Sequence, residues 1–457
     1  MSLTKAHHPS KPFADRAYRC WLDPSLLFWS LVLLLWSPFA LFHRVRRALF
    51  RDKHDPFVKE RWTAELQTPE TTRALLAKNG PHVVLVGASF GEILIIDKIT
   101  KALRGARPEA KVTWAIRDPA TVEHVKKMHP GQSVVYWPYD WLTPVTRWIS
   151  RTRPDIVVML ERFRFPIFVR ANKRCGADVV LVNGRCQPRK FFFSTGRLYY
   201  KWLFAGFRAL FFQNERYLEN AKPLLSPRTH AQAIGDIKFD LSHLPIDPEK
   251  AAAVDRWLAS LGDLPLLAVG STEDLEEETF VIDAFLSVRK TTPVRLLVAP
   301  RRLVRLEELL NLIKSKGLTY SLRSKMDGDA DVYVLDSFGE LSYAYQFATA
   351  AYVAGALSGM GHNVIEPLEW GIPVSYGTVR GHFGLIQEAC ERAGVGTRIG
   401  SVSQLAIHWS GILSSEQSKA EIHDQCKRMI EQHRGAISAT MDEVLALIDE
   451  HEKGSER

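Results

Sequence analysis

Residues 331–377 have the sequence DVYVLDSFGELSYAYQFATAAYVAGALSGMGHNVIEPLEWGIPVSYG. The apolar runs Val332–Leu335 and Ala351–Val353 are typical of buried strands, and each precedes a short polar loop and a segment with helical spacing. Glycines in the loops let the backbone approach a ligand, and free N–H groups at a helix start favour an anion. This pattern predicts a site for a ligand that carries phosphate and ribose, such as a nucleotide-activated donor. The alternative is that these segments are ordinary loops that connect strands to helices and bind no ligand.

The same alternation extends in both directions along the chain. An earlier series of apolar runs covers His82–Val86, Val112–Ile116, Asp155–Leu160, Val179–Val182 and Leu210–Gln213; the later series covers Leu266–Val269, Leu296–Ala299, Val332–Leu335, Ala351–Val353 and Pro373–Tyr376. Continuous apolar strands between helical segments, such as Ile93–Leu103 and Glu276–Val288, predict parallel sheets covered on both faces. We therefore expect an α/β fold with two Rossmann-like, doubly wound domains, whose ligands lie at the carboxyl ends of the strands.

A length of 457 residues fits two or three domains of about 100–200 residues each. The segment Leu241–Pro248, LSHLPIDP, breaks both periodicities and predicts the boundary. We expect an N-terminal basic segment and anchor over residues 1–50, an acceptor-binding domain over 51–245 and a donor-binding domain over 246–457. A charged helical segment from about Ser418 is expected to pack on the surface.

Composition excludes several classes of protein. The hydrophobic fraction of 46% and the charged fraction of 24% are ordinary for a globular chain, so a disordered or fibrous protein is not expected. The net charge of +9 is concentrated at the start, where residues 1–62 hold eleven Lys/Arg and five Asp/Glu. A basic end beside an apolar segment favours an anionic membrane surface over nucleic acid. Five cysteines without a C-x-x-C pair predict neither a disulfide framework nor a zinc site, and favour a reducing compartment.

The apolar segment is Leu26–Phe42, LLFWSLVLLLWSPFALF. Its length is at the lower limit for a membrane-spanning helix, and Pro38 would kink it. The basic residues that follow (Arg44, Arg46, Arg47 and Arg51) would stay on the cytoplasmic side. We expect a single span or an oblique anchor that holds the catalytic domains on the cytoplasmic face of the inner membrane. A buried core helix is the alternative.

Two carboxylates follow predicted strands in the first half of the chain. Glu92 closes VGASFGE, a glycine-rich loop that opens a helix, and is a candidate base. Ser89 and Glu92 also have the spacing of a capping box, in which the glutamate only accepts a backbone N–H. Glu161 directly follows the apolar run Asp155–Leu160 and has no obvious structural partner, although Arg162 and Arg164 could neutralise it.

Two basic motifs complete the set of candidate site residues. GDIKFD places Lys238 just before the predicted boundary, although lysines are usually solvated. VAPRR closes a strand with Arg301 and Arg302, and a guanidinium fork there suits a phosphate or a carboxylate.

In their order along the chain, these motifs resemble the Kdo transferases of lipopolysaccharide synthesis, which have GT-B glycosyltransferase architecture. The resemblance covers residues 59–396 and rests on KERW (59–62), VGASFGE, LERFRFP (160–166), VNGR (182–185), GDIKFD, GSTEDLEEE (270–278), APRR, DSFGEL and GMGHNVIEP. It implies transfer of 3-deoxy-D-manno-octulosonic acid (Kdo) from CMP-Kdo to a lipid A precursor, lipid IVA. One displacement with one base predicts inversion at the anomeric carbon.

The resemblance also assigns roles to residues. Glu92 takes the place of the catalytic base, and Glu161 and Lys238 occupy positions credited with transition-state stabilisation. The CMP-binding positions are Pro300, Arg301, Phe338, Gly339, Glu340, Asn363, Val364, Ile365 and Glu366. Apart from the donor substrate, no cofactor and no metal is expected, because no Asp-x-Asp or His-rich set stands out in the motif loops. The expected partners are CMP-Kdo, the lipid acceptor and a membrane surface, without nucleic acid.

The chain departs from the family pattern at several positions. Phe163 stands where the pattern has a second glutamate, Glu273 where it has a histidine after S-T, and Arg302 where it has the histidine of P-R-H. These departures leave open a non-catalytic, membrane-tethered nucleotide-sugar binding protein. Another GT-B-like nucleotide-sugar enzyme such as an epimerase, which would share the nucleotide-binding loops, is a second alternative.

Overall fold

The structure is a computed structural model that describes residues 20–32, 61–62, 80–88, 90–161, 163–187, 196–227, 229–241, 246–355, 361–378, 382–415 and 419–455. The chain forms two compact units. The first comprises Met1–Asp240 together with Gly435–Arg457, and the second comprises Leu241–Arg434. The end of the chain thus belongs to the first unit, whereas we expected residues 246–457 to form one domain.

The described part of the first unit is built on a seven-stranded parallel sheet with the order β3-β2-β1-β4-β5-β6-β7. Its strands are β1 (His82–Gly87), β2 (Lys111–Ile116), β3 (Ser133–Tyr136), β4 (Ile156–Leu160), β5 (Asp178–Gly184), β6 (Ala209–Phe212) and β7 (His230–Ala233). Every residue of β1 and β4 is buried. Because successive side chains of a strand point to opposite faces, both faces of the sheet are covered at its centre.

Helices alternate with these strands: α5 (Phe90–Ala106), α6 (Pro119–Met128), α7 (Leu142–Thr152), α8 (Pro166–Arg174), α9 (Gly196–Phe204), α10 (Glu215–Ala221) and, from the end of the chain, α19 (Ala436–Ser455). The local sequence explains where some of them begin. Asp118 accepts a hydrogen bond from Thr121 N–H and precedes Pro119 at the first turn of α6. Asn214 caps α10 in the same way, through Tyr217 N–H.

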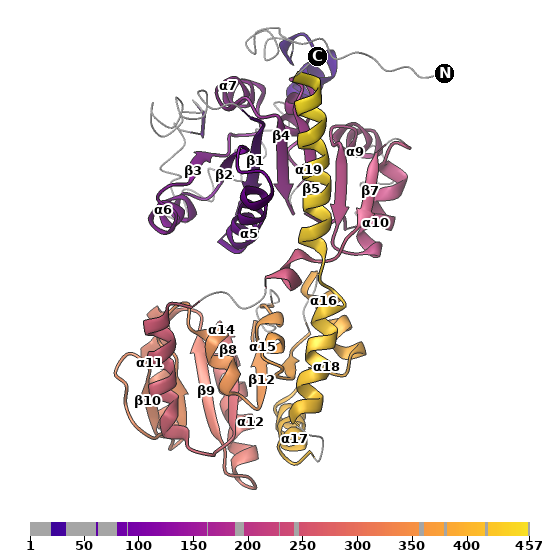
Figure 1. The fold of residues 1–457 in the computed structure, drawn as a ribbon. Helices are drawn as coiled ribbons and strands as arrows, with labels where there is room; N and C mark the ends of the chain where they lie inside the picture. The colour runs from indigo at the N-terminus through magenta and orange to yellow at the C-terminus, as the bar shows by residue number, and fades with distance from the viewer. Residues whose placement is uncertain are drawn as a thin grey trace. The chain divides into compact units, whose positions relative to one another are not determined.

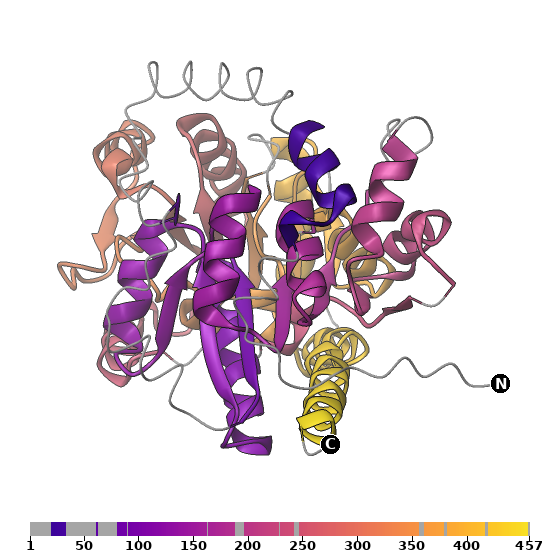
Figure 2. The same ribbon diagram turned by 90° about the horizontal axis from the view of Figure 1, so that it is seen from above.

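Helix α19 packs along α5, β4 and β5, as Figures 1 and 2 show. Its entry is fixed by Asp240, whose carboxylate accepts hydrogen bonds from Gly435 N–H (2.8 Å) and Ile437 N–H (2.6 Å). Its last turns carry ion pairs to the first unit, including Arg107–Asp449 at 2.6 Å and Arg208–Glu450 at 3.1 Å. These contacts explain why the chain returns to the unit in which it began.

Residues 24–32 of the N-terminal segment form a helix whose Trp29 packs on α9, and Cys20 and Asp23 just before it contact Ala171 and Arg174 of α8. Leu26 is buried, and the Trp29 ring lies 5.0 Å from that of Tyr199 and 5.5 Å from that of Trp202. Leu22, Phe28 and Leu31 are exposed. Among the described helices, none is long and apolar enough to cross a membrane. Residues 33–42 of the predicted anchor lie outside the described residues, so the anchor stays a prediction.

The described part of the second unit has a seven-stranded parallel sheet with the order β10-β11-β9-β8-β12-β13-β14. Its strands are β8 (Leu266–Thr272), β9 (Arg295–Pro300), β10 (Tyr320–Leu322), β11 (Val332–Val334), β12 (Ala350–Val353), β13 (Val374–Tyr376) and β14 (Gly396–Arg398). The helices are α11 (Pro248–Leu258), α12 (Leu275–Arg289), α13 (Leu306–Ser315), α14 (Leu341–Ala344), α15 (Ile365–Glu369), α16 (His382–Arg392), α17 (Val402–Leu413) and α18 (Lys419–Glu431). Helices α12, α13 and α17 share one apolar core with β8, β9, β11 and β12.

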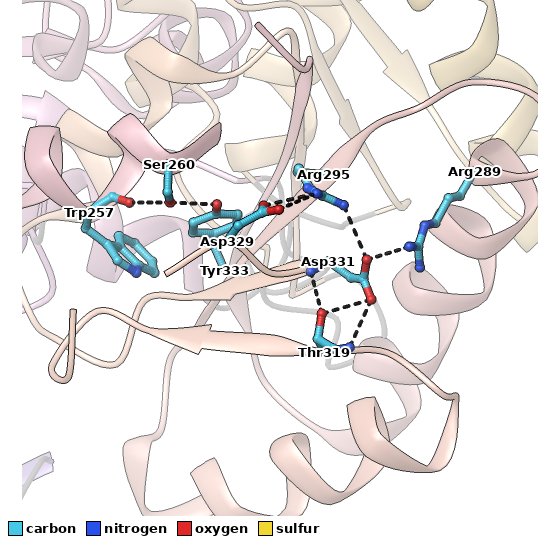
Figure 3. Close-up of polar contacts among 8 residues, drawn as sticks. All are labelled: Trp257, Ser260, Arg289, Arg295, Thr319, Asp329, Asp331 and Tyr333. Carbon is cyan, nitrogen blue, oxygen red and sulfur yellow. Dashed lines mark hydrogen bonds and ion pairs between the residues drawn. The ribbon is translucent and has the colours of Figure 1, made fainter. Parts of the chain in front are cut away.

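A polar network ties the amino ends of β9 and β11 together (Figure 3). One carboxylate oxygen of Asp331 binds Arg289 at 2.5 Å and Arg295 at 3.3 Å. The other accepts from the N–H and the hydroxyl of Thr319, both at 3.0 Å. This network lies at the amino ends of the strands, whereas ligands of doubly wound domains bind at the carboxyl ends. The network therefore stabilises the fold and is not part of the expected ligand site.

Every strand that the sequence predicted is present, within three residues at its ends. The four strands that it missed are β3, β7, β10 and β14, and in the described structure these are the edges of the two sheets.

Candidate active site

The central reversal of strand order lies between β1 and β4 in the first sheet and between β8 and β12 in the second, and candidate residues follow these strands. In the first unit β1 lies beside β4, with Val86 opposite Met159. In the second unit β8 lies beside β12, with Gly270 opposite Val353. Side chains at the carboxyl ends of such strand pairs line the crevice in which doubly wound proteins bind ligands.

Glu92 lies in the first turn of α5, directly after β1. Its side chain is buried, and its Oε2 accepts a hydrogen bond of 2.6 Å from Ala88 N–H. A carboxylate at this position also interacts favourably with the positive end of the helix dipole. A carboxylate that accepts a backbone N–H is what the structural alternative predicts, but the donor is Ala88, one residue before the cap position of the Ser89–Glu92 box. Ser89 itself lies outside the described residues. The role of Glu92 as a base stays a prediction.

Glu161 forms the centre of a charged cluster at the end of β4. It forms an ion pair with Arg185, lies 3.9 Å from Lys238 Nζ, and accepts a hydrogen bond of 3.2 Å from Asn183 Nδ2. The structure thus brings together Glu161 and Lys238, which are 77 positions apart in the sequence. Arg185 and Asn183 were not predicted as site residues, although both lie in the VNGR motif that ends β5.

The backbone around this cluster is held in an unusual conformation. Glu161 and Asn183 have φ angles of 56° and 57°, in the left-handed region that non-glycine residues rarely adopt. Asn183 Oδ1 accepts Ile237 N–H at 3.0 Å, and Asp236 accepts Lys238 N–H at 3.1 Å. Burial raises the pKa of Asp236, while the nearby Lys238 lowers it. Left-handed residues of this kind concentrate at functional sites, where surrounding contacts maintain them.

A second cluster lies at the carboxyl ends of β8 and β9. Glu273 is buried, and its Oε1 lies 3.4 Å from Arg301 Nε and 3.1 Å from His362 Nε2. Its Oε2 lies 3.3 Å from an Nη of Arg302. Burial lowers the pKa of His362, the positive charge of Arg301 lowers it further, and Glu273 opposes both. The imidazole is therefore neutral at physiological pH, and the charges of this cluster are one carboxylate and two guanidinium groups.

Two more buried glutamates support this cluster. Glu277 accepts Gly355 N–H at 2.7 Å and Glu273 N–H at 3.2 Å. Gly355 has a φ of 93°, and a Cβ on it would lie 2.6 Å from the His362 ring, so glycine is required there. Glu278 accepts the Thr272 hydroxyl at 3.0 Å, and burial raises its pKa to about 7. Neither glutamate was predicted as a site residue; the signal was the run of three glutamates in GSTEDLEEE.

The predicted donor loop at 338–340 is partly exposed. Phe338 is exposed and its carbonyl accepts Lys250 Nζ at 3.1 Å, while Gly339 has a φ of 81°. Glu340 is buried instead, and binds Arg323 at 3.1 Å and the Ser337 hydroxyl at 2.5 Å. The carboxylate of Glu340 thus organises the loop around Gly339.

The predicted residues 363–366 form a compact turn at the start of α15. Asn363 accepts Ile365 N–H at 3.2 Å and donates to Glu366 Oε1 at 3.1 Å. Burial raises the pKa of Glu366. Val364 and Ile365 are buried, so their side chains pack in the core and only their backbone is suited to a ligand. Helices α14 and α15 have four and five residues, so the helix dipole that we expected to favour an anion is small.

The chain matches known Kdo transferases. Residues 59–241 match the family model described as 3-deoxy-D-manno-octulosonic-acid transferase (kdotransferase). The chain is 24% identical over 375 residues to a 3-deoxy-D-manno-octulosonic acid transferase of Chlamydia trachomatis serovar D, covering 79% of this chain and 85% of that protein. Residues 59–241 therefore carry the domain of the Kdo transferase family, and the chain is similar to Kdo transferases over most of its length. The predicted resemblance is thereby confirmed.

A longer relative and two solved structures complete the comparison. The chain is 22% identical over 398 residues to a bifunctional glycosyltransferase/methyltransferase of Fusobacterium nucleatum; the match covers 84% of this chain and 60% of that protein. A glycosyltransferase from Rickettsia africae has a TM-score of 0.57 at 13% identity, covering 81% of this chain and 98% of its own. A UDP-GlcNAc 2-epimerase from Neisseria meningitidis has a TM-score of 0.54 at 9% identity, covering 81% of this chain and 100% of its own. These likenesses confirm the predicted pair of parallel-sheet α/β domains and show GT-B-like neighbours.

Proposed function

We propose that this protein transfers Kdo from CMP-Kdo to a lipid A precursor, lipid IVA, in lipopolysaccharide synthesis. The observation that carries the proposal is the convergence of charged side chains on the strand reversal of each unit: Glu161, Arg185 and Lys238 in the first, Arg301 and Arg302 around Glu273 in the second. The first cluster lies within the residues that match the family model. Such positions are where a doubly wound unit binds its ligand.

The proposed reaction is a single displacement. A hydroxyl oxygen of the acceptor attacks the anomeric carbon of Kdo, its proton passes to Glu92, and the bond from that carbon to the phosphate oxygen of CMP breaks. The electron pair leaves with the phosphate, so negative charge grows there. Arg301 is suited to stabilise that charge, because a guanidinium group can pair with two phosphate oxygens at once. One displacement with one base predicts inversion at the anomeric carbon.

Metal independence is part of the proposal. Arginine and lysine would supply the positive charge that a divalent cation supplies in many phosphate-transferring enzymes. Among the residues that the structure describes, no three His, Cys, Asp or Glu side chains gather as a candidate metal site. Turnover that is unchanged by a chelator such as EDTA is the expected result, and loss of turnover that is restored by Mg²⁺ would contradict it.

We also propose that the protein acts on the cytoplasmic face of the inner membrane. The apolar segment Leu26–Phe42 and the four arginines that follow it support this placement. Replacing Arg44, Arg46, Arg47 and Arg51 with Gln should shift the protein from the membrane fraction to the soluble fraction. An unchanged distribution between the fractions would contradict a role for these charges.

The decisive experiment incubates the purified protein with CMP-Kdo and lipid IVA in detergent. We expect a product heavier by one or more Kdo units by mass spectrometry, with release of CMP. UDP-N-acetylglucosamine serves as the competing donor in a parallel reaction. Turnover of the UDP-sugar without turnover of CMP-Kdo would favour an epimerase-like enzyme, and CMP-Kdo binding without any product would favour a binding protein.

A further inference from the structure

The carboxylate of Glu273 occupies the centre of the arginine cluster in the second unit. Both of its oxygens are engaged, Oε1 towards Arg301 and His362 and Oε2 towards Arg302. Its backbone is held as well: the N–H donates to Glu277 at 3.2 Å, and the carbonyl accepts an Nη of Arg305 at 2.9 Å. Glu273 therefore has little freedom to move away when an anion arrives.

Two of these residues are positions at which the chain departs from the family pattern. Glu273 and Arg302 each replace a histidine of that pattern, and here they contact each other at 3.3 Å. Together they add one negative and one positive charge, so the net charge of the cluster remains that of Arg301 alone, since His362 is neutral. The two departures balance each other electrostatically.

Burial differs sharply between the carboxylate and the guanidinium groups. Glu273 is buried, whereas more than half of the side chain of Arg301 and of Arg302 is exposed. Only the Nε edge of Arg301 faces Glu273, at 3.4 Å. A buried carboxylate that lost one of its two arginines would be drawn more strongly to the other, because a carboxylate and a guanidinium prefer two parallel hydrogen bonds.

We propose that Glu273 and Arg302 form a compensating pair that sets the donor affinity of Arg301. Arg302 neutralises Glu273 and thereby leaves the outer edge of Arg301 available to the phosphate of the donor. Arg302 acts through Glu273 and is a positioning residue; it does not bind the phosphate itself. This inference rests on the proposed function, in which Arg301 binds the phosphate of a CMP-activated donor.

The test measures the affinity of CMP by isothermal titration calorimetry for the full-length protein and four variants. We expect Arg302→Gln to weaken CMP binding about tenfold, because Glu273 then captures Arg301. Glu273→Gln should bind CMP at least as tightly as the wild type. The double variant Glu273→Gln/Arg302→Gln should recover an affinity within about threefold of the wild type.

The matched control is Glu391→Gln. Glu391 is a carboxylate on α16 that pairs with Arg398 at 3.1 Å, away from the Glu273 cluster. Its removal changes the net charge by the same amount as Glu273→Gln, so a gain in CMP affinity of the same size in the two variants would mean that only the overall charge matters and would overturn the proposal. Thermal unfolding of each variant shows whether it is folded. Arg302 is exposed, so its variant keeps the test informative even if Glu273→Gln does not fold.

Two further results would overturn the inference. CMP affinity unchanged in Arg302→Gln would mean that Glu273 does not compete for Arg301. An equal loss in Arg302→Gln and in the double variant would mean that Arg302 contacts the phosphate directly. Failure of the proposed function looks different: the wild-type protein would then not bind CMP, whereas here the wild type binds and only the pattern among the variants fails.

Discussion

Each unit places a carboxylate beside two cations at the end of a central strand, but the two clusters differ in how far the cations reach solvent. In the first unit the side chains of Glu161, Arg185 and Lys238 are 12%, 21% and 20% exposed. In the second unit Glu273 is 7% exposed, while Arg301 and Arg302 are 56% and 62% exposed. We call the cluster of Glu161, Arg185 and Lys238 the closed cluster, because its cations are largely buried. The cluster of Glu273, Arg301 and Arg302 is the open cluster, because its cations are largely exposed.

This difference indicates different uses of charge. In the first unit the backbone at Glu161 and Asn183 is left-handed and the side chains bond to one another, so the cluster has a fixed shape that suits stabilisation of a transition state. In the second unit the guanidinium groups keep open edges, which suits an anionic ligand that comes and goes. The predictions below test this division of roles, from the largest expected effect to the smallest.

The largest effect is expected at Glu92. If its carboxylate takes the proton of the acceptor, Glu92→Gln should lower kcat by roughly 10²–10⁴-fold. The amide oxygen of Gln can still accept from Ala88 N–H, so the free energy of unfolding should change little. Steady-state turnover and thermal unfolding check the two statements, with the exposed Glu123→Gln as the control. Near-normal turnover in Glu92→Gln would leave Glu92 with only its structural contact to Ala88 N–H.

Breaking the closed cluster should have the next largest effect. Glu161→Gln removes the charge that holds Arg185 and Lys238, and we expect kcat to fall by about 10²-fold because the arrangement of cations in the transition state is lost. CMP affinity should stay within about threefold, since the donor phosphate is assigned to the open cluster. A loss confined to CMP affinity, with kcat preserved, would reverse the roles of the two clusters. Glu219→Gln, at an exposed pair with Lys222, is the control.

In the open cluster, CMP affinity should depend on the shape of the cationic group and not only on its charge. Arg301→Lys keeps the positive charge but loses the paired hydrogen bonds of the guanidinium, so we expect CMP affinity to fall about tenfold. Arg302→Lys still neutralises Glu273 and should bind CMP within about twofold of the wild type. Calorimetric titration with CMP compares the two. Equal affinities for wild type and Arg301→Lys would place the phosphate elsewhere.

The central strands of each sheet were predicted from the sequence, and the edge strands were not. The ten predicted runs became strands because a strand buried on both faces is apolar without interruption, which is a strong signal. The sequence signal of the edge strands is weaker: β7 is His-Ala-Gln-Ala and β14 is Gly-Thr-Arg, and their side chains are partly exposed. Short, polar edge strands protect a sheet from pairing with other chains. For the same reason they lack the continuous apolar run by which a central strand is recognised.

The candidate site shows a similar limit. Position after a strand was enough to select Glu161 and Arg301, because parallel strands bring their carboxyl ends to the same end of the sheet. Lys238 was selected for its place beside the predicted domain boundary. Which side chains then pair could not be deduced, because the pairing of Glu273 with Arg302 depends on the order of β8 and β9 in the sheet. The return of α19 to the first unit was missed for the same reason: an amphipathic helix shows that it packs, but not on what.

The smallest effect is expected where α19 packs on the first unit. His451 Nε2 lies 3.1 Å from Asp178, and this hydrogen bond is the main cause of a pKa raised above the ordinary 6.5, with burial opposing it and the nearby Asp155 and Glu450 adding to it. The folded state therefore holds the proton more tightly than the unfolded chain does. The resulting stabilisation is fully present below pH 6.5 and is lost as the pH rises through the pKa of the folded state.

For this partly exposed pair we expect about 1 kcal/mol or less, which corresponds to roughly 2 °C in the melting temperature of the first unit. His451→Gln should therefore melt below the wild type at pH 6 and at nearly the same temperature at pH 8, and Asp178→Asn should remove the same pH dependence. Thermal unfolding of the full-length protein at the two pH values provides the measurement. A difference between wild type and His451→Gln that is equal at pH 6 and pH 8 would show that the contact stabilises α19 by packing and not by its proton.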